Sequence, residues 1–453
     1  MNPLNVVILA AGKGTRMHSA KPKVLHHLAG KALVQHVMDC ASALNPEQIC
    51  VVYGHGGEAV PKALNASMAT YVIQEPQLGT GHAVQQAMPL LLDDSQTLIL
   101  YGDVPLIQQT TLHRMQQVAG GLILLTVFMD NPTGYGRIVR NEKGDVTGIV
   151  EEKDATDEIR EIKEVNTGIM LAPTKLLREC LSNLRTNNSQ GEYYLTDVVG
   201  MAVDAGVVVH TVQPNHEWEI QGINSKAQLA VLERTWQRVE AQRLLEQGVT
   251  LADPARFDLR GKLLCGRDVE IDVGCIFEGD VQLGNNVTIG AYCIIKNARI
   301  DDGTQIAAFS HIDSSEVGAD CRIGPYARLR PGSKLHADVH VGNFVEIKNS
   351  EINQASKANH LSYIGDTTMG RRVNVGAGTI TCNYDGANKF RTVIEDDVFI
   401  GSDTQLVAPV TIAKGTTIGA GSTITRDTPQ DELTLSRSKQ ITINGWKRPV
   451  KKK

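Results

Sequence analysis

The chain has 453 residues, a length that allows two or three domains with sizeable cores. Its hydrophobic fraction of 42% and charged fraction of 21% are ordinary for a globular protein. The formal net charge of −5 argues against a surface dedicated to nucleic acid, and the short basic tail at Lys447, Arg448 and Lys451 to Lys453 is better explained as a solvated terminus.

The eight cysteines form no Cys-x-x-Cys pair and no His/Cys cluster at the spacing of a zinc site, so we expect reduced, mostly buried thiols. Asn2 and Pro3 lead directly into a short predicted strand, without the basic start and apolar run of a signal peptide. No apolar run approaches the length of a transmembrane helix. The sequence therefore predicts a cytoplasmic protein without membrane contact.

Up to about residue 225, short β-branched runs alternate with helical stretches. The predicted strands are Val6 to Leu9, Ile49 to Tyr53, Thr70 to Gln74, Leu98 to Tyr101 and Leu122 to Val127. This alternation is typical of a Rossmann-like α/β domain with a mixed, mainly parallel sheet covered on both faces. Ligands of such sheets bind at the carboxyl ends of the strands, so chemistry is expected in the loops that follow these runs.

The first of these loops is rich in glycine and positive charge. It reads Leu9-Ala10-Ala11-Gly12-Lys13-Gly14-Thr15-Arg16-Met17, with Pro22-Lys23 shortly after it. Backbone amides in such a loop can approach an anion closely, and the arginine and lysine add charge. The loop is neither the dinucleotide-binding Gly-x-Gly-x-x-Gly motif nor a Walker loop. On these residues alone, a tight structural turn is an equal alternative.

Together with two later segments, this loop resembles the signature of the sugar-1-phosphate nucleotidyltransferases. The segments are Gln74 with Leu78-Gly79-Thr80-Gly81, and Tyr101-Gly102-Asp103. The resemblance implies that the Gln74 side chain and the Gly79 backbone read a uracil base, and that Asp103 holds Mg²⁺ with Asn224 as its partner. It implies a site for UTP and the UDP-sugar at Leu9, Ala10, Ala11, Gly12, Lys23, Gln74, Gly79, Thr80, Tyr101, Gly102, Asp103, Gly136, Glu151, Asn166 and Asn224.

The reaction of that family suits these residue types. An oxygen of the sugar phosphate attacks the α-phosphorus of a nucleoside triphosphate and pyrophosphate leaves, so the accumulating charge must be neutralised by Mg²⁺, Arg16 and Lys23. No protein nucleophile is required. Asp103 supplies the hard oxygen that Mg²⁺ prefers, although a carboxylate that caps a helix is the alternative interpretation.

Between Ser225 and Gln247 apolar residues recur at helical spacing, and Gly248 stands where a C-terminal cap would. Asp253 and Pro254 then mark a break. We therefore expect three parts: a nucleotidyltransferase domain at 1–226, a linker helix at 227–247, and a repeat domain with a C-terminal tail at 248–453.

The third part carries a large aliphatic residue at every sixth position. The regular series is Ile394, Ile400, Leu406, Ile412, Ile418 and Ile424. A period of six is neither helical nor that of a half-buried strand, and it is typical of a parallel β-helix of hexapeptide repeats. Less regular repeats upstream predict a solenoid from roughly residue 250 to roughly 430, on the order of ten coils. A small residue after the aliphatic, such as Gly401, is expected to let the chain turn at the next corner.

The repeat is interrupted between Val375 and Thr392, where an irregular segment from Gly376 to Phe390 intervenes. An irregular insertion in a regular solenoid usually serves binding or a neighbouring chain. His360 precedes it. Taken by itself, a single histidine in this setting is more often a surface or corner residue than a catalyst.

This third part resembles the acetyl-CoA-dependent acyltransferases built on a left-handed parallel β-helix. The resemblance implies that His360 is the general base, because a sugar amine must lose a proton before it attacks a thioester. It assigns Arg330 and Lys348 to the sugar 1-phosphate, and Tyr363 and Asn374 to the ring hydroxyls. It assigns acetyl-CoA to Ala377, Asn383, Tyr384, Ser402, Ala420 and Arg437. Because such enzymes are trimers, it implies a homotrimer with sites between subunits.

Together the two halves resemble bacterial enzymes that carry both activities in one chain. The implied reactions are acetylation of glucosamine-1-phosphate by acetyl-CoA, then transfer of a uridylyl group from UTP to N-acetylglucosamine-1-phosphate, which yields UDP-N-acetylglucosamine for peptidoglycan and lipopolysaccharide synthesis. One alternative is a single-activity nucleotide-sugar pyrophosphorylase with a non-catalytic β-helix, against which His360, Arg330 and Lys348 argue. The other is a non-catalytic assembly subunit, which would not need the metal and phosphate residues.

Overall fold

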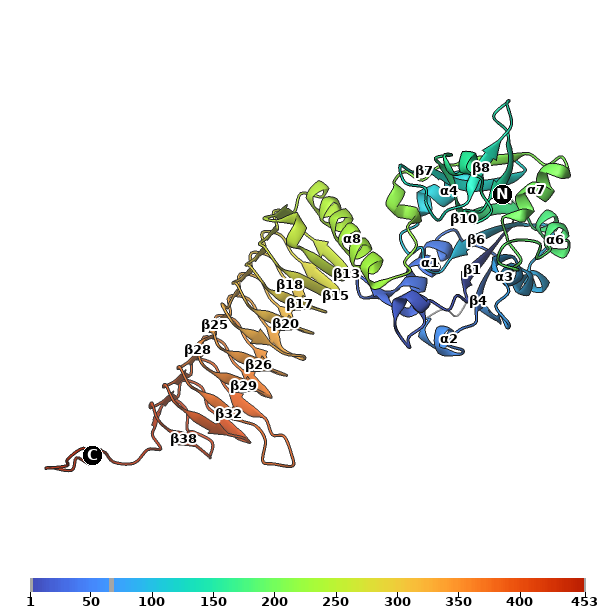
Figure 1. Cartoon of the computed structure of the whole chain (residues 1–453). Coiled ribbons are helices and arrows are strands. Elements are labelled where there is room, and N and C mark those ends of the chain that lie inside the picture. The colour runs from blue at the N-terminus through green and yellow to red at the C-terminus, as the bar shows by residue number, and fades with distance from the viewer. Residues whose placement is uncertain (1–2, 65–68, 452–453) are drawn as a thin grey trace. The chain divides into compact units, whose positions relative to one another are not determined.

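The computed structural model describes residues 3–64 and 69–451, so Asn2 and the last two lysines of the basic tail lie outside the described residues. The chain divides into two compact units, Met1–Trp236 and Gln237–Lys453. Figure 1 shows a layered α/β body for the first unit and a stack of coils for the second.

The first unit is built on a nine-stranded sheet whose main path runs β11, β7, β10, β6, β1, β4, β5, with the hairpin of β8 and β9 paired to β10. Strands β6, β1, β4 and β5 are parallel neighbours, whereas β10 runs antiparallel between β6 and β7. The bounds are β1 (Leu4–Ala10), β4 (Gln48–Tyr53), β5 (Ala69–Ile73), β6 (Gln96–Tyr101), β7 (Leu122–Phe128), β8 (Arg137–Arg140), β9 (Val146–Val150), β10 (Glu164–Pro173) and β11 (Val209–Val212). All five predicted strands are present, which confirms the mixed, mainly parallel sheet.

Both faces of this sheet are covered. Alternation along β1 sends Val6 and Ile8 to a core shared with α1 and α4, and sends Val7 and Leu9 to a core shared with α3, α6 and α7. Both faces of the strand are therefore apolar, as expected for a strand buried on two sides. The helices are α1 (Leu33–Ser42), α2 (Ala59–Ala63), α3 (Thr80–Ala87), α4 (Gln109–Gln117), α5 (Asp157–Arg160), α6 (Thr174–Ser182) and α7 (Asp197–Asp204), and a small hairpin joins β2 (His27–Leu28) to β3 (Lys31–Ala32).

The predicted connecting helix is confirmed as α8 (Lys226–Glu246), and Gly248 follows it with a φ of 90°. The division between the two units falls inside this helix, after Trp236. Its first half contributes Leu232 to the core of the first unit, and its second half contributes Leu244 to the core of the second. Across the described part of the chain, no helix is both long and apolar enough to cross a membrane.

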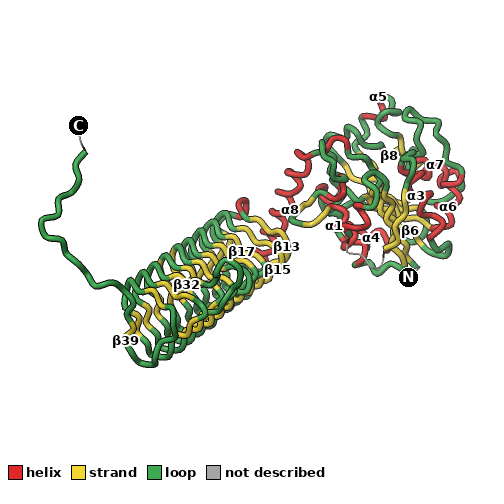
Figure 2. The backbone as a smooth tube through the Cα atoms, turned by 90° about the horizontal axis from the view of Figure 1, so that it is seen from below, coloured by secondary structure: helices red, strands yellow, loops and turns green. Residues whose placement is uncertain are grey.

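The second unit is a parallel β-solenoid with three faces, which Figure 2 shows as a stack of short strands. Face one is the eleven-stranded sheet of β12 (Thr250–Leu251), β14 (Glu270–Ile271), β16 (Thr288–Ile289), β19 (Gln305–Ile306), β22 (Arg322–Ile323), β25 (His340–Asn343), β28 (Lys357–His360), β31 (Asn374–Val375), β34 (Phe399–Ile400), β37 (Thr417–Ile418) and β39 (Leu433–Thr434).

Faces two and three share the seventeen-stranded sheet, because β13 (Asp258–Cys265) and β15 (Ile276–Leu283) run through both. Face two holds β17 (Ile294–Lys296), β20 (His311–Asp313), β23 (Arg328–Leu329), β26 (Glu346–Lys348), β29 (Tyr363–Gly365), β32 (Ile380–Cys382), β35 (Gln405–Val407) and β38 (Thr423–Ile424). Face three holds β18 (Arg299–Ile300), β21 (Glu316–Val317), β24 (Lys334–Leu335), β27 (Glu351–Ile352), β30 (Thr367–Met369), β33 (Thr392–Ile394) and β36 (Val410–Ile412).

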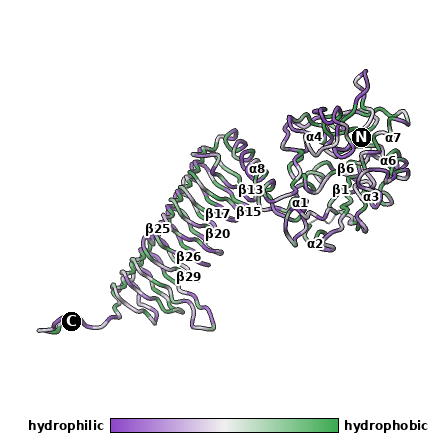
Figure 3. The backbone as a smooth tube through the Cα atoms, viewed as in Figure 1, coloured by the Kyte–Doolittle hydropathy of each residue, from purple (hydrophilic) through white to green (hydrophobic). Residues whose placement is uncertain are grey.

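The six-residue ladder forms the core of this solenoid. All its members from Ile394 to Ile424 are at most 3% exposed. Figure 3 shows the resulting alternation of hydrophobic and hydrophilic stretches along the coils. The cysteines are free thiols, as predicted, and Cys275, Cys293 and Cys321 are buried in this core.

The role predicted for the small residue after each aliphatic is wrong in detail. A Cβ atom on Gly401 would lie 2.5 Å from the backbone nitrogen of Ala420 on the next coil. The left-handed residue of that corner is Asp403, with a φ of 55°. Gly401 is therefore required by the close approach of two coils, and the turn itself is made two residues later.

The predicted start of the insertion is also wrong. Strand β32 continues face two after Val375, and Thr381 takes the inward position of the ladder, where it is 1% exposed. Its hydroxyl oxygen accepts a hydrogen bond of 2.8 Å from the Gly365 N–H, which satisfies the buried polar atom. The irregular segment therefore lies between β32 and β33, and the described part of the tail beyond β39, residues 435–451, is exposed.

Candidate active sites

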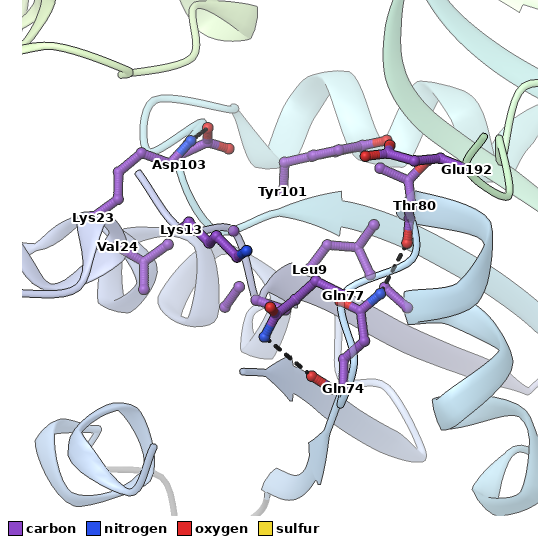
Figure 4. A pocket seen from close by; sticks show the side chains of 15 residues that line it. Leu9, Lys13, Lys23, Val24, Gln74, Gln77, Thr80, Tyr101, Asp103 and Glu192 are labelled. Atoms are coloured by element: carbon purple, nitrogen blue, oxygen red, sulfur yellow. Dashed lines mark hydrogen bonds and ion pairs between the residues drawn. The ribbon is translucent and has the colours of Figure 1, made fainter. Parts of the chain in front are cut away.

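The first unit holds a cavity of about 370 Å³ at the carboxyl ends of β1, β5 and β6. The predicted residues that line it are Leu9, Ala10, Ala11, Gly12, Lys23, Gln74, Gly79, Thr80, Tyr101 and Asp103. Figure 4 shows Lys23 and Asp103 on one side of this cavity and Gln74 with Gln77 on another. The cavity thus collects segments that are far apart in the sequence.

Lys23 Nζ lies between the two predicted metal ligands. It forms an ion pair with the Asp103 carboxylate and a hydrogen bond of 2.9 Å with Asn224 Oδ1. The side chains of Lys23 and Asp103 are only 12% and 16% exposed, so solvent screens the pair weakly. Asp103 and Asn224 therefore direct two oxygens at one cation.

Two such oxygens fit Mg²⁺, which is usually held by one or two protein ligands together with waters and substrate phosphates. In the described ranges, no group of three or more His, Cys, Asp or Glu side chains is arranged to hold a metal. A metal at Asp103 and Asn224 would therefore need oxygens from the substrate to complete its coordination.

The predicted base-reading residues are hydrogen-bonded to each other. Gln74 is 3% exposed, and its Nε2 donates to the Gly79 carbonyl at 2.9 Å. This bond orients the side-chain amide, so that Gln74 Oε1 and the Gly79 N–H offer an acceptor and a donor. Gly79 has a φ of 106° and no room for a Cβ, which would lie 2.6 Å from the Tyr193 carbonyl.

Three residues of the predicted site for UTP and the UDP-sugar, Gly136, Glu151 and Asn166, lie next to one another. The Asn166 N–H donates to the Gly136 carbonyl at 2.8 Å, and a Cβ on Gly136 would lie 3.4 Å from the Glu151 carboxylate. Burial raises the pKa of Glu151, and a hydrogen bond of 3.1 Å from Thr196 Oγ1 opposes that shift. Glu151 thus presents a partly desolvated carboxylate beside two backbone groups.

A buried arginine fixes the loop that carries Gly136. Arg137 is 1% exposed, forms an ion pair of 2.8 Å with Glu152, and donates to the carbonyls of Tyr135 and Arg160. Glu152 in turn accepts a hydrogen bond of 3.2 Å from the Gly134 N–H. Arg137 directly follows the predicted residue Gly136 and was not itself predicted to have a role.

Six predicted residues lie outside the lining of the cavity: Arg16, Gly102, Gly136, Glu151, Asn166 and Asn224. Arg16 is exposed on the short helix Thr15–Met17, and Gly102 packs between the ends of β1 and β6, where its N–H donates to Leu9 at 2.9 Å. Lys13 and Glu192 line the cavity and were not predicted. Lys13 stands inside the quoted glycine motif, whereas Glu192 belongs to a distant loop without any local signal.

In the second unit, three cations gather near the corner between faces two and three. Arg330 forms an ion pair of 2.8 Å with Glu346, and Lys348 lies 3.6 Å from the Asp366 carboxylate. Lys389 arrives from the insertion, and the neighbouring Lys348 ammonium lowers its pKa. Lys389 was not predicted, although a lysine in the irregular segment was a visible signal. Because the cluster holds three cations and two carboxylates, its net charge is positive and it can bind an anion.

Asp366 organises this group. The Nδ2 atoms of Asn349 and Asn383 both donate to its carboxylate, and Asn383 Nδ2 also lies 3.5 Å from the Tyr363 hydroxyl. Burial opposes ionisation of Asp366, but these hydrogen bonds and the Lys348 charge outweigh it and lower the pKa of the carboxyl group. Asp366 therefore stays ionised and holds Lys348 and Asn383 in place.

His360 ends β28, at the corner between faces one and two. Its Nδ1 lies 2.9 Å from Asn343 Oδ1 on the preceding coil. An amide oxygen only accepts, so Nδ1 is the donor in this contact, and in the neutral imidazole Nε2 is then the nitrogen with the free lone pair. Asn343 was not predicted, because its closeness to His360 depends on how successive coils align.

Ala377, Ser402 and Ala420 stack at the same corner on successive coils. The N–H after Ser402 donates to the Ala377 carbonyl at 2.7 Å, and the N–H after Ala420 donates to the Ser402 carbonyl at 2.8 Å. Arg437 joins them from the tail, where its Nη1 donates to the Ala420 carbonyl at 2.9 Å. Four of the predicted acetyl-CoA residues therefore lie in one row that continues from His360, in which Ser402, Ala420 and Arg437 are exposed and Ala377 is half-buried.

Three other predicted ligands lie apart from this row. Asn383 is 7% exposed and belongs to the group around Asp366. Asn374 lies on face one in register with Lys357, across the corner from Tyr363 on face two. Tyr384 projects from the insertion and is 59% exposed.

Three family models match successive parts of the chain. They are the MobA-like NTP transferase domain at residues 6–190, the GMPPB C-terminal domain at residues 259–352, and the six-repeat bacterial transferase hexapeptide at residues 391–426. The first match covers the α/β unit and the other two fall on the solenoid.

The chain is also similar along its whole length to proteins named Bifunctional protein GlmU. It is 62% identical over 450 residues to the one from Herminiimonas arsenicoxydans, with 99% of each chain covered. It is 62% identical over 455 residues to that of Nitrosospira multiformis, with 100% of this chain and 99% of the relative covered. It is 59% identical over 452 residues to that of Ralstonia nicotianae, with 99% of each covered.

Proposed function

The chain belongs to the family of bifunctional GlmU proteins, and from that membership we propose how its residues divide two reactions between two sites. The protein is a bifunctional uridyltransferase and acetyltransferase in the synthesis of UDP-N-acetylglucosamine. We assign uridylyl transfer to the cavity of the first unit and acetyl transfer to the His360 corner of the solenoid. The observation that carries this assignment is the gathering of Lys23, Asp103 and Asn224 in one place and of Arg330, Lys348 and Lys389 in another.

In the first unit, an oxygen of N-acetylglucosamine-1-phosphate attacks the α-phosphorus of UTP, and the bond to the leaving pyrophosphate breaks. The residues of the chain neutralise the charge on the phosphates and orient the substrates, and none forms a covalent bond with a substrate. Gln74 and Gly79 hold the uracil edge, while Gly136, Glu151 and Asn166 hold the sugar. Arg16 and Lys23 stabilise the negative charge on the phosphates. The remaining nucleotide contacts of the proposal are Leu9, Ala10, Ala11, Gly12, Thr80, Tyr101 and Gly102.

Asp103 and Asn224 would hold Mg²⁺, which when bound supplies Lewis-acid stabilisation of the charge on the phosphates. The Lys23 ammonium occupies the space between these two oxygens. A divalent cation bound there would displace the Lys23 ammonium from these oxygens. Lys23 would then be available to pair with a phosphate of the substrate instead of the Asp103 carboxylate.

In the second unit, His360 Nε2 takes a proton from the amine of glucosamine-1-phosphate. The amine nitrogen then attacks the thioester carbonyl of acetyl-CoA, the carbon–sulfur bond breaks, and the coenzyme A thiolate takes up a proton. The Asn343 amide keeps the histidine in the required tautomer. Arg330, Lys348 and Lys389 bind the 1-phosphate, and Tyr363 with Asn374 orient the ring.

Acetyl-CoA is assigned to Ala377, Asn383, Tyr384, Ser402, Ala420 and Arg437. The row at Ala377, Ser402 and Ala420 is open to solvent on one chain, which supports a homotrimer whose neighbouring subunit closes the site. UTP and acetyl-CoA are available in the cytoplasm, so we propose that the protein is located there. We keep the division into 1–226, 227–247 and 248–453 as part of the proposal.

Incubation of the protein with glucosamine-1-phosphate, acetyl-CoA, UTP and Mg²⁺ tests the proposal. The expected result is equal release of free thiol, pyrophosphate and UDP-N-acetylglucosamine. Without acetyl-CoA, pyrophosphate should appear only when N-acetylglucosamine-1-phosphate is supplied. Pyrophosphate release without any thiol release would instead identify a single-activity pyrophosphorylase.

A further inference from the structure

We infer that His82 sets the base specificity of uridylyl transfer, because it fixes which end of the Gln74 amide faces the nucleotide. His82 lies on α3 and is outside the lining of the cavity, so it acts as a positioning residue through Gln74. The inference rests on the proposed function, in which Gln74 and Gly79 hold the uracil edge. It adds the group that decides between uracil and cytosine.

Base discrimination at this site depends on the orientation of one side-chain amide. Uracil has a proton on N3 and a carbonyl oxygen on C4, whereas cytosine has a lone pair on N3 and an amino group on C4. An amide oxygen beside a backbone N–H donor therefore matches uracil and opposes cytosine. An amide turned the other way would offer its N–H to cytosine N3. Selection for uracil thus requires that the amide does not turn.

Two acceptors hold the Gln74 nitrogen away from the base. Nε2 donates to the Gly79 carbonyl at 2.9 Å, as Figure 4 shows, and lies 3.2 Å from His82 Nδ1. The Gly79 carbonyl is shared, because it also accepts the Ala83 N–H at 3.2 Å. Gln74 is only 3% exposed, so an amide proton without a partner would be costly there. His82 supplies the second acceptor and leaves the Gln74 oxygen for the base.

The contact with Gln74 also fixes the tautomer of His82. Since Gln74 Nε2 is a donor, Nδ1 of the neutral ring accepts and the ring proton lies on Nε2. The amide nitrogen of Gln86 lies 3.1 Å from His82 Nε2, but a neutral imidazole cannot accept from both amides. The Gly79 carbonyl prevents Gln74 from turning. Gln86 is half-buried and can turn its oxygen to His82 Nε2, which stabilises the required tautomer.

The ring of His82 is held in this position by a neighbouring loop. It stacks on the ring of Tyr193, with centroids 6.2 Å apart and an interplanar angle of 30°. The Tyr193 N–H donates to the Leu78 carbonyl at 2.8 Å, and the Tyr193 carbonyl accepts from the Gly81 N–H at 2.8 Å. One residue therefore fixes both the segment that contains Gly79 and the histidine that orients Gln74.

The test compares UTP with CTP as substrates of the full chain, in the presence of N-acetylglucosamine-1-phosphate and Mg²⁺. The kcat/KM for pyrophosphate release and the melting temperature are measured for wild type, His82→Ala and His82→Asn. The asparagine variant is the rescue, because its Oδ1 can take the place of Nδ1 and accept from Gln74. His113→Ala is the matched control, because His113 is exposed on α4 and lies 3.1 Å from Gln109 and 3.0 Å from Gln116.

We expect the ratio of kcat/KM for UTP to kcat/KM for CTP to fall about tenfold in His82→Ala, a change equal to the loss of one hydrogen bond. In His82→Asn and His113→Ala the ratio should stay within about threefold of the wild-type value. An equal loss with both nucleotides in His82→Ala would indicate a merely structural role and overturn the inference. A ratio in His82→Asn as low as that in His82→Ala would also overturn it.

The variant Gln74→Ala separates this inference from the proposed function. If Gln74 reads the base, its loss should lower kcat/KM for UTP by about tenfold or more and bring the ratio closer to one. Wild-type use of UTP and a wild-type ratio in Gln74→Ala would overturn the base assignment itself. The expected loss in Gln74→Ala together with an unchanged ratio in His82→Ala would overturn only the role of His82.

Discussion

The two sites of this protein are built in opposite ways. The first unit gathers residues from distant loops around one cavity, and a single chain provides all the residues proposed to bind the base, the sugar and the metal. The second unit stacks residues from adjacent coils along a corner, and His360 remains exposed there. Loops that meet at one edge of a sheet can enclose a ligand within one chain. A solenoid presents a row of residues on its surface, and such a row needs a second surface opposite it to enclose a ligand.

The difference extends to how the cations are held before substrate arrives. In the first unit Lys23 sits between Asp103 and Asn224, the two oxygens proposed for the metal. In the second unit Lys348 and Arg330 rest on Asp366 and Glu346. Each site thus keeps its positive charge paired with a carboxylate, but only in the first does the pairing compete directly with a metal ion.

If the two sites are independent, Asp103→Asn should give the largest difference between its effects on the two activities. Loss of the carboxylate would remove the principal metal ligand of the proposed site. The loss of several kcal/mol of charge stabilisation should lower uridylyl transfer by about a thousandfold or more. Acetyl transfer should be unchanged. Pyrophosphate and free thiol are measured separately on the same preparation, and retained pyrophosphate release would refute the metal assignment.

The reciprocal variant, His360→Ala, should lower acetyl transfer by about a hundredfold to ten-thousandfold, the range usual for a general base. Uridylyl transfer should stay at the wild-type rate. His336→Ala serves as a control, because His336 lies on another face and pairs with Glu351 at 2.9 Å. Acetylation at the wild-type rate in His360→Ala would rule out the base role.

The same contrast explains what the sequence could predict. The five strands and the ladder from Ile394 to Ile424 follow from local patterns of hydrophobicity, and all are confirmed. Thr381 was misjudged because a buried hydroxyl breaks the apolar pattern while its hydrogen bond to Gly365 preserves the coil. The six-residue repeat of aliphatic residues reflects packing in the core, so it does not identify a core position where a polar side chain packs equally well.

The residues that were missed depend on neighbours distant in the sequence. Asn343 matters because the next coil places His360 against it, and Glu192 matters because its loop closes on Gly79. Neither has a local motif. The glycine loop after β1, by contrast, was visible because one short segment contributes several residues to the lining of the same cavity.

A finer comparison concerns the charge that the insertion brings. Lys389→Ala removes one of the three cations near the corner between faces two and three. We expect the KM for glucosamine-1-phosphate to rise about tenfold, because a charge-assisted contact to the phosphate contributes roughly 1.5 kcal/mol. The KM for acetyl-CoA should change little. Lys414→Ala, an exposed lysine at a different corner, is the matched control. Equal KM values in the two variants would remove Lys389 from the phosphate site.

The smallest expected effect concerns the carboxyl groups, whose pKa values shift in opposite directions at the two sites. Burial raises the pKa of Glu151 above its ordinary value of 4.5, whereas that of Asp366 is lowered from 3.8, because hydrogen bonds and Lys348 outweigh its burial. As pH falls, Glu151 takes up a proton at a higher pH than an ordinary glutamic acid does, and it does so before Asp366. The KM for N-acetylglucosamine-1-phosphate should therefore rise a few-fold more in wild type than in Glu151→Gln, whose amide does not titrate. The comparison with that variant also cancels protonation of the sugar phosphate itself, which occurs near pH 6. A parallel pH dependence of KM in wild type and Glu151→Gln would show that the buried carboxylate does not contact the sugar.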